Sequence, residues 1–89
     1  MKNIRPEELA DNVQSKADFL LFLDSLIQDF NINRAEWENK NINDYLLSIE
    51  MFTEYFENYY KNNSLPIPQI DTQAWRLFAD ILMAGKIYE

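Results

Sequence analysis

Apolar residues recur at helical spacing in three separate segments of this chain, and this pattern constrains the fold more than any other feature. In the first segment, residues 19–30, apolar side chains return every three or four positions and so share one face of an α-helix. They are Phe19, Leu20, Phe22, Leu23, Leu26, Ile27 and Phe30. Ser15 precedes this face, with Asp18 three residues later, a spacing typical of a helix N-cap. Leu21 falls off the face and is expected to be exposed.

A second helix is predicted from a cap at Asn41 or Asn43 to about Tyr60. Its apolar face comprises Tyr45, Leu46, Ile49, Phe52, Phe56, Tyr59 and Tyr60. A third helix is predicted to begin at a cap at Asp71 or Thr72. Its apolar residues are Trp75, Leu77, Phe78, Ala79, Ile81, Leu82 and Tyr88. Because this apolar arc is wide and polar positions are few, we expect the third helix to be the most buried.

The remaining segments are short. Pro6 and the two glutamates that follow it predict a short N-terminal helix, because proline and acidic residues favour a first turn. Residues 31–43 are rich in asparagine and are expected to form a structured loop with one helical turn. Residues 65–68 contain two prolines and predict an extended connection. With no segment alternating at period two, the sequence predicts an all-α fold: a small bundle of three main helices plus a short N-terminal helix, in one domain spanning residues 1–89.

The composition removes the residues on which most active sites depend. The chain has no histidine, no cysteine and one glycine, Gly85. Histidine and cysteine supply general bases, nucleophiles and metal ligands, and glycine-rich loops cradle phosphates. We therefore expect no catalytic, cofactor-binding or metal-binding residue and no enzymatic activity. Glu36 and Glu38 are close in sequence, but a carboxylate pair needs a cleft that so short a chain rarely forms.

The chain is acidic, with fifteen acidic and eight basic residues and a formal net charge of −7. This charge disfavours a nucleic-acid partner and favours a basic protein partner. The alternative is that it serves only solubility. The longest uncharged apolar run, residues 19–23, is too short to span a membrane, and the first residues lack a signal-peptide core. We therefore expect a cytoplasmic protein that binds no membrane.

Three glutamates are spaced to stack on the outward side of the second predicted helix. They are Glu50, Glu54 and Glu57, which we call the glutamate ridge. Like charges at this spacing repel each other and slightly destabilise a helix. Because a basic surface would relieve this repulsion, the ridge is a candidate docking site for such a surface. The alternative is a solvated helix face. Without histidine beside them, these glutamates do not indicate a metal site.

A second apolar face on the same helix is formed by Leu47, Met51 and Tyr55, which we call the apolar line. A helix with two apolar faces is either covered on both sides by its neighbours or exposes one of them to a partner. Methionine and aromatic residues are enriched at interface cores. The apolar line is therefore a second candidate partner-binding surface, and it could also join two copies of the chain.

Trp37 lies in the polar loop of residues 31–43. A tryptophan there is expected to cover the core as a lid, with Glu38 and Asn39 bonding loop amides. The alternative is a binding hot spot, in which tryptophan is enriched. Both Trp37 and Trp75 are expected to be mostly buried.

A recognisable pattern of residues is spread over residues 13–89. Its most recognisable parts are the triplet Trp37-Glu38-Asn39 and the pair Tyr88-Glu89. It also includes Phe19, Phe22, Leu23, Leu26, Tyr45, Leu46, Trp75, Ala79, Leu82 and Ala84. This pattern resembles a family of short bacterial proteins of unknown function, from which it departs at Phe52, where a tryptophan is expected. The resemblance implies no activity, cofactor or catalytic residue.

These features predict a non-enzymatic protein-interaction module. The most specific form of the prediction is an acidic immunity-type inhibitor that binds a basic toxin or nuclease, by a loose analogy with small acidic immunity proteins. Electrostatic steering would speed the association of such a pair. The alternative is a homodimeric structural or regulatory module.

Overall fold

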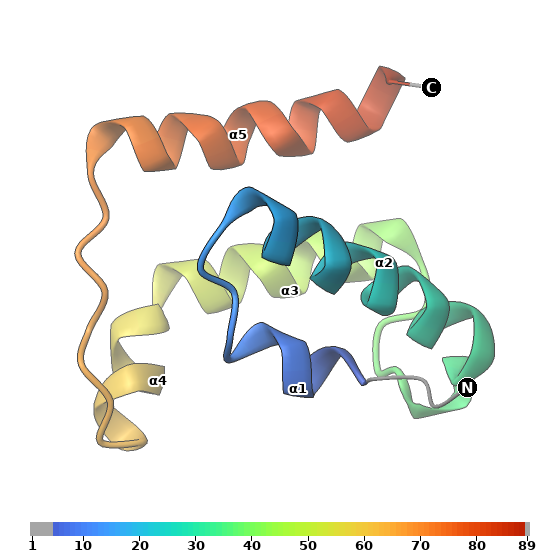
Figure 1. Ribbon diagram of the computed structural model, residues 1–89, viewed down its shortest axis with the longest axis horizontal. Helices are drawn as coiled ribbons and strands as arrows, with labels where there is room; N and C mark the ends of the chain where they lie inside the picture. The colour runs from blue at the N-terminus through green and yellow to red at the C-terminus, as the bar shows by residue number, and fades with distance from the viewer. Residues whose placement is uncertain (1–4, 89) are drawn as a thin grey trace. The chain divides into compact units, whose positions relative to one another are not determined.

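A computed structural model describes residues 5–88, and these residues are 73% helical with no β-strand. The elements are α1 (Pro6–Ala10), α2 (Lys16–Ile32), the 3-10 turn η1 (Arg34–Glu36), α3 (Ile42–Glu54), α4 (Phe56–Asn62) and α5 (Thr72–Ile87), as Figure 1 shows. The predicted all-α fold is therefore confirmed. The chain divides into two compact units between Met51 and Phe52. The single domain remains a prediction.

Side-chain caps fix where three of the helices begin. Ser15 Oγ accepts a hydrogen bond from the Asp18 backbone N–H at 3.1 Å, and this cap starts α2. Of the alternatives at the next start, Asn41 is the cap, because its Oδ1 accepts from the Asp44 N–H at 2.8 Å. Asp71 caps α5 and accepts from the Ala74 N–H at 2.8 Å. Each cap satisfies an amide that the first helical turn leaves without a partner.

The single helix predicted to reach Tyr60 is wrong, because the helix breaks at Tyr55. The backbone of Tyr55 has φ −122° and ψ 24°, which separates α3 from α4. Bulky aromatic residues lose side-chain freedom in a helix, and five of them lie near this point. Their rings instead pack across the break, with Phe52 edge-on to Tyr59 at 5.4 Å between ring centroids.

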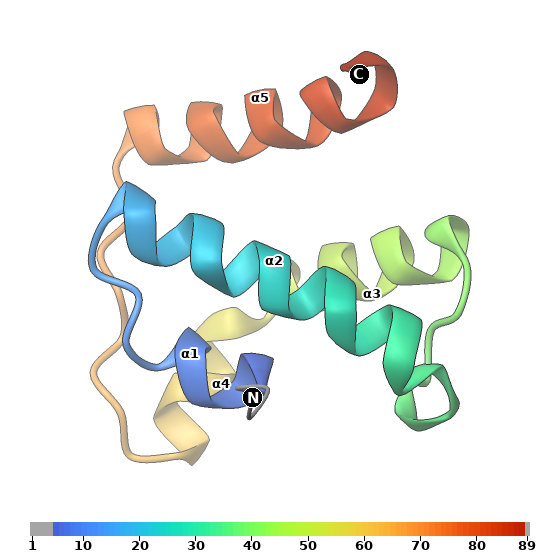
Figure 2. The same cartoon turned by 45° about the vertical axis from the view of Figure 1, so that its right-hand side comes forward.

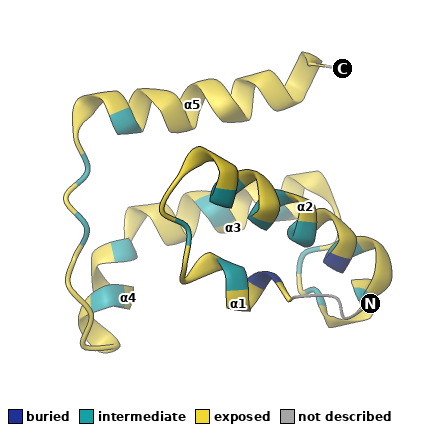
Figure 3. Ribbon diagram, in the orientation of Figure 1, coloured by how far each residue is buried: buried dark blue, intermediate teal, exposed yellow. Residues whose placement is uncertain are grey.

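In the N-terminal unit, α1 lies against one side of α2 (Figures 1 and 2). The apolar face of α2 is confirmed in part: its half-buried members are Phe19, Phe22, Leu23, Leu26 and Phe30. Leu20 and Ile27 were expected on this face but are exposed, while Leu21 is exposed as predicted. Figure 3 shows how few positions are buried, and among residues 5–88 these are Pro6 and Asp29. The common apolar core expected for the three main helices remains a prediction, because α2 and α5 belong to different units.

In the C-terminal unit, α5 is not the most buried helix, contrary to the prediction. Trp75 is 41% exposed, and its ring meets Phe56 and Phe78 edge-on at 6.0 and 5.8 Å. Ala74 is the one half-buried residue of this helix. Other residues of its apolar arc are more exposed still, including Leu77 at 55% and Leu82 at 52%. Tyr88 caps the helix at its C-terminal end and is exposed.

The cap of α2 gives a direct test of this account of the fold. Ser15→Ala should lower the free energy of unfolding by about 0.5–2 kcal/mol, because the Asp18 amide loses its acceptor. Urea denaturation followed by circular dichroism measures the change. The control is Ser48→Ala on the exposed surface of α3, which should leave stability equal or slightly higher. Equal effects of the two substitutions would contradict the cap.

Candidate interaction site

Asp29 is the most notable polar residue of the structure, because its side chain is buried and charged. It belongs to α2 and is 7% exposed. Its Oδ2 accepts a hydrogen bond from the Trp37 indole Nε1–H at 2.8 Å, and its Oδ1 accepts from Asn33 Nδ2 at 2.8 Å. A buried carboxylate is stable only where donors replace the water it has lost. The turn η1 and the residues around it supply those donors.

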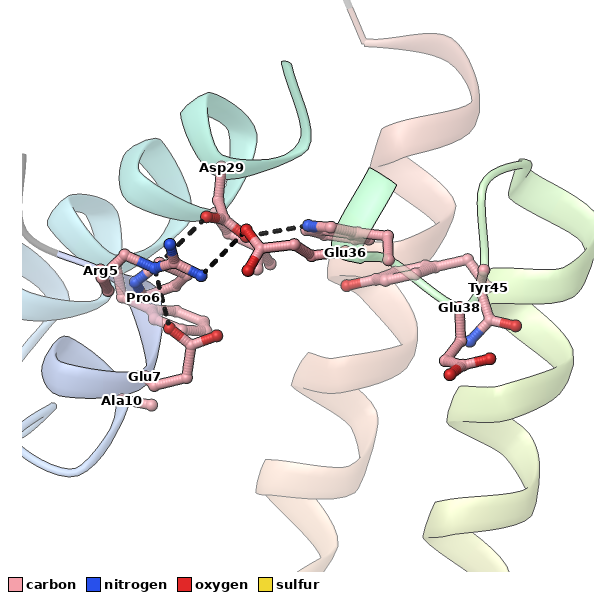
Figure 4. A pocket seen from close by; sticks show the side chains of 12 residues that line it. Arg5, Pro6, Glu7, Ala10, Asp29, Glu36, Glu38 and Tyr45 are labelled. Carbon is pink, nitrogen blue, oxygen red and sulfur yellow. Dashed lines mark hydrogen bonds and ion pairs between the residues drawn. The ribbon is translucent and has the colours of Figure 1, made fainter. Parts of the chain in front are cut away.

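Arg5 joins α1 to this carboxylate. Its Nε lies 3.7 Å from Asp29 Oδ1, and its Nη2 lies 3.4 Å from Glu36 Oε2 (Figure 4). A third ion pair links Arg5 to Glu7 at 3.7 Å. The carboxylates of Glu36 and then Asp29 raise the pKa of Arg5 above its ordinary value. One guanidinium is therefore shared among three carboxylates from α1, α2 and η1.

Trp37 stands between aromatic neighbours from two helices. Its ring meets Phe30 edge-on at 5.0 Å and stacks on Tyr45 at 6.0 Å with 25° between the planes. It is half-buried, less than was expected. Besides packing on these rings, the indole covers Asp29, since its N–H donates to that carboxylate.

Two hollows adjoin Trp37. The anionic hollow, of about 380 Å³, is lined by Arg5, Pro6, Glu7, Ala10, Phe22, Leu26, Asp29, Glu36, Trp37, Glu38, Asn39 and Tyr45. The apolar hollow, of about 490 Å³, is lined by Leu26, Ile27, Phe30, Asn31, Trp37, Asn39, Lys40, Asn41, Ile42 and Tyr45. Trp37 and Tyr45 contribute to both. The first therefore combines negative charge with aromatic surface, and the second is mainly apolar.

The pKa of Asp29 defines what this site can do chemically. The hydrogen bond from Asn33, then that from Trp37, lowers the pKa of this carboxyl below its ordinary value, with a smaller contribution from Arg5, while burial acts in the opposite direction. Asp29 is therefore ionised at neutral pH and serves as an acceptor rather than as a proton donor. No group of three or more acidic residues within residues 5–88 is arranged to hold a metal ion.

The structure does not gather the residues of the glutamate ridge on one helix. Glu50 and Glu54 lie on α3, whereas Glu57 lies on α4 beyond the break. The register that would stack the three carboxylates is therefore interrupted. All three are exposed, and none forms an ion pair within the described part of the chain.

The residues of the apolar line are exposed rather than covered on both sides. Leu47 and Met51 lie on α3 and are 54% and 68% exposed, and Tyr55, 57% exposed, lies at the break itself. Leu47 and Met51, four residues apart, share one side of α3, and Glu50, three residues after Leu47, borders that side.

Sequence reasoning missed the cluster around Asp29. Asp29 falls on the polar side of the apolar periodicity of α2, and this position gives no indication that its carboxylate is buried. Asn33 follows it by four residues, a spacing at which side chains on a helix meet. That spacing is a weak local signal, and nothing comparable indicates that Arg5 would join the cluster.

The chain belongs to a family of unknown function, DUF7660, which matches residues 15–89. No curated protein and no solved structure matches the chain. The match includes Asp29, Glu36 and Trp37, whereas Arg5 and α1 precede it. Across residues 5–88, no helix combines the length and the apolar character needed to cross a membrane.

The lowered pKa of Asp29 predicts a loss of stability in acid. A carboxyl whose pKa is lower in the folded state contributes stability above its unfolded pKa of about 4, and this contribution disappears as the pH falls through the folded pKa. Asp29→Asn should therefore make Tm less dependent on pH below about pH 4 while lowering it at neutral pH. Calorimetry across this range measures both effects. Asp24→Asn, the same change at an exposed position of α2, should lower Tm at neutral pH much less; equal lowering would contradict the role of Asp29.

The indole N–H of Trp37 gives a second prediction. Trp37→Phe keeps an aromatic ring but removes the donor to Asp29, so the free energy of unfolding should fall by about 1.5–3 kcal/mol, the range for hydrogen bonds to charged groups. Urea denaturation measures this change. Trp75→Phe is the matched control, because Trp75 is 41% exposed and keeps an aromatic edge for Phe56 and Phe78. A cost no larger than that of the control would contradict the hydrogen bond.

Proposed function

We propose that this chain is a non-enzymatic protein-interaction module whose partner is a basic protein. The observation that carries the proposal is a set of exposed and unpaired carboxylates next to exposed apolar side chains. On α3, Leu47 and Met51 are more than half exposed, and the Glu50 carboxylate, beside them on the helix, has no cation partner within residues 5–88. Apolar surface bordered by charge is typical of docking sites, and the net charge of −7 selects positively charged partners.

The finer form of this proposal is an immunity-type inhibitor that acts in the bacterial cytoplasm and binds a basic toxin or nuclease. An inhibitor of this kind must associate quickly, and opposite charges on the two proteins increase the association rate. The carboxylates of the glutamate ridge would act in steering, whereas Leu47 and Met51 would supply the area buried on contact. The Trp37-Glu38-Asn39 triplet and the C-terminal Tyr88-Glu89 would mark related bacterial proteins.

A second candidate function is a homodimeric structural or regulatory module. The exposure of the apolar line favours it, because Leu47, Met51 and Tyr55 could be covered by a second copy of the chain. The two candidate functions predict opposite effects of removing negative charge from the chain. Removal of carboxylates should weaken the binding of a basic protein, but it should strengthen self-association, since two acidic copies repel each other.

Charge removal at the glutamate ridge tests the proposal. The variant carrying Glu50→Gln, Glu54→Gln and Glu57→Gln keeps the shape of the side chains and changes the net charge from −7 to −4. Its matched control carries Glu8→Gln, Asp11→Asn and Asp24→Asn, the same charge change at exposed positions outside the ridge. Stopped-flow association with a basic protein that binds the original chain, at two ionic strengths, compares them. Sedimentation of each variant alone reports self-association.

The ridge variant should associate about tenfold more slowly at low salt and show a weaker salt dependence, as expected for steering charges. The control should show a smaller effect. Equal rates for the ridge variant and the original chain would contradict a role of the ridge in steering. A dimer that dissociates on Met51→Glu, together with no binding of a basic protein, would favour the second candidate function instead.

A further inference from the structure

We propose that the anionic hollow beside Trp37 receives an arginine side chain of the basic protein partner. This inference rests on the proposed function and specifies where and how such a partner is recognised. Three properties of the hollow carry it: its excess of negative charge, its aromatic surface, and the guanidinium that it already accommodates from its own chain.

The charge of the hollow is unbalanced. Four carboxylates line it, those of Glu7, Asp29, Glu36 and Glu38, against the single guanidinium of Arg5. Arg5 contacts the first three of these carboxylates. The Glu38 carboxylate has no hydrogen-bond or ion-pair partner within residues 5–88. In Figure 4, Glu38 lies next to Tyr45, on the side of the hollow away from Arg5. The Glu38 carboxylate is therefore available to pair with a second cation.

The aromatic surface of the hollow favours a planar cation. Trp37 and Tyr45 lie with their rings only 25° from parallel and 6.0 Å apart, and both line the hollow together with Glu38. A guanidinium stacks on an aromatic face and also donates in its own plane to a carboxylate. Lysine can form the ion pair but cannot stack in this way. The combination of Glu38 with two aromatic rings thus fits arginine better than lysine.

Two arginines of the chain already make the two kinds of contact proposed here, an ion pair with a carboxylate and a cation–π contact with an aromatic ring. Arg5 donates from Nη2 to Glu36 Oε2 at 3.4 Å, so a guanidinium fits among the carboxylates of the hollow. The guanidinium carbon of Arg34 lies 4.5 Å from the centre of the Phe30 ring, so an aromatic residue of the same cluster accepts a cation on its face. The volume of about 380 Å³ leaves room for a side chain in addition to those that line the hollow.

The experiment uses the full chain labelled with ¹⁵N and the peptide acetyl-Gly-Arg-Gly-amide as the probe. The matched peptides carry citrulline, the neutral analogue of arginine, or lysine. The indole N–H resonance of Trp37 reports on the hollow, and that of Trp75 in the other unit is the internal control. Glu38→Gln removes the unpaired carboxylate from an exposed position, and Glu50→Gln makes the same change on α3. Thermal melting verifies that both variants fold.

The arginine peptide should shift the Trp37 resonance in a saturable way, leave that of Trp75 in place, and bind more tightly than the lysine peptide. Citrulline should abolish the shift, and Glu38→Gln should weaken binding by about three- to tenfold while Glu50→Gln leaves it unchanged. Equal binding of the citrulline peptide, or equal effects of the two variants, would overturn the proposal. If a basic protein binds the chain but Glu38→Gln does not weaken it, the inference fails and the proposed function stands. If the peptide binds as expected but no basic protein does, the proposed function fails instead.

Discussion

The carboxylate of Asp29 is almost out of contact with water, and a buried charge persists only where neighbouring groups replace the lost hydration. Trp37 and Asn33 each supply a short hydrogen bond, and Arg5 adds a cation. These contacts with Asp29 connect α1 and the turn η1 to α2, and they hold the Trp37 indole in one orientation. The same orientation presents Trp37 to the anionic hollow beside Glu38. A local electrostatic requirement thus positions the surface proposed for recognition.

Most of the helical content could be predicted from the sequence because it depends on local rules. The apolar spacing of residues 19–30 and the cap at Ser15 are both set within a few residues, and the structure has α2 where they place it. The cap at Asp71 is equally local. The all-α class follows from these elements, because helical spacing in each long segment leaves none for a strand.

The features that the sequence did not reveal depend on contacts between segments. Asp29 receives its indole donor from eight residues away and its cation from Arg5, and no periodicity expresses such partners. The break at Tyr55 was hidden for a related reason. Apolar spacing continues through it, but the Tyr55 backbone leaves the helical conformation, and Phe52 and Tyr59 pack edge-on across the break. The anionic hollow could not be predicted from the sequence either, because its lining residues come from α1, α2, η1 and α3.

The central claim is that the Trp37 indole N–H is held by the buried Asp29 carboxylate. Hydrogen exchange of the two indole N–H groups, followed by nuclear magnetic resonance in the native protein, tests it most directly. The account predicts that the indole proton of Trp37 exchanges many times more slowly than that of Trp75, and that Asp29→Ala, which leaves no side-chain acceptor, removes most of this difference. Equal exchange of the two indole protons in the original chain would contradict the account.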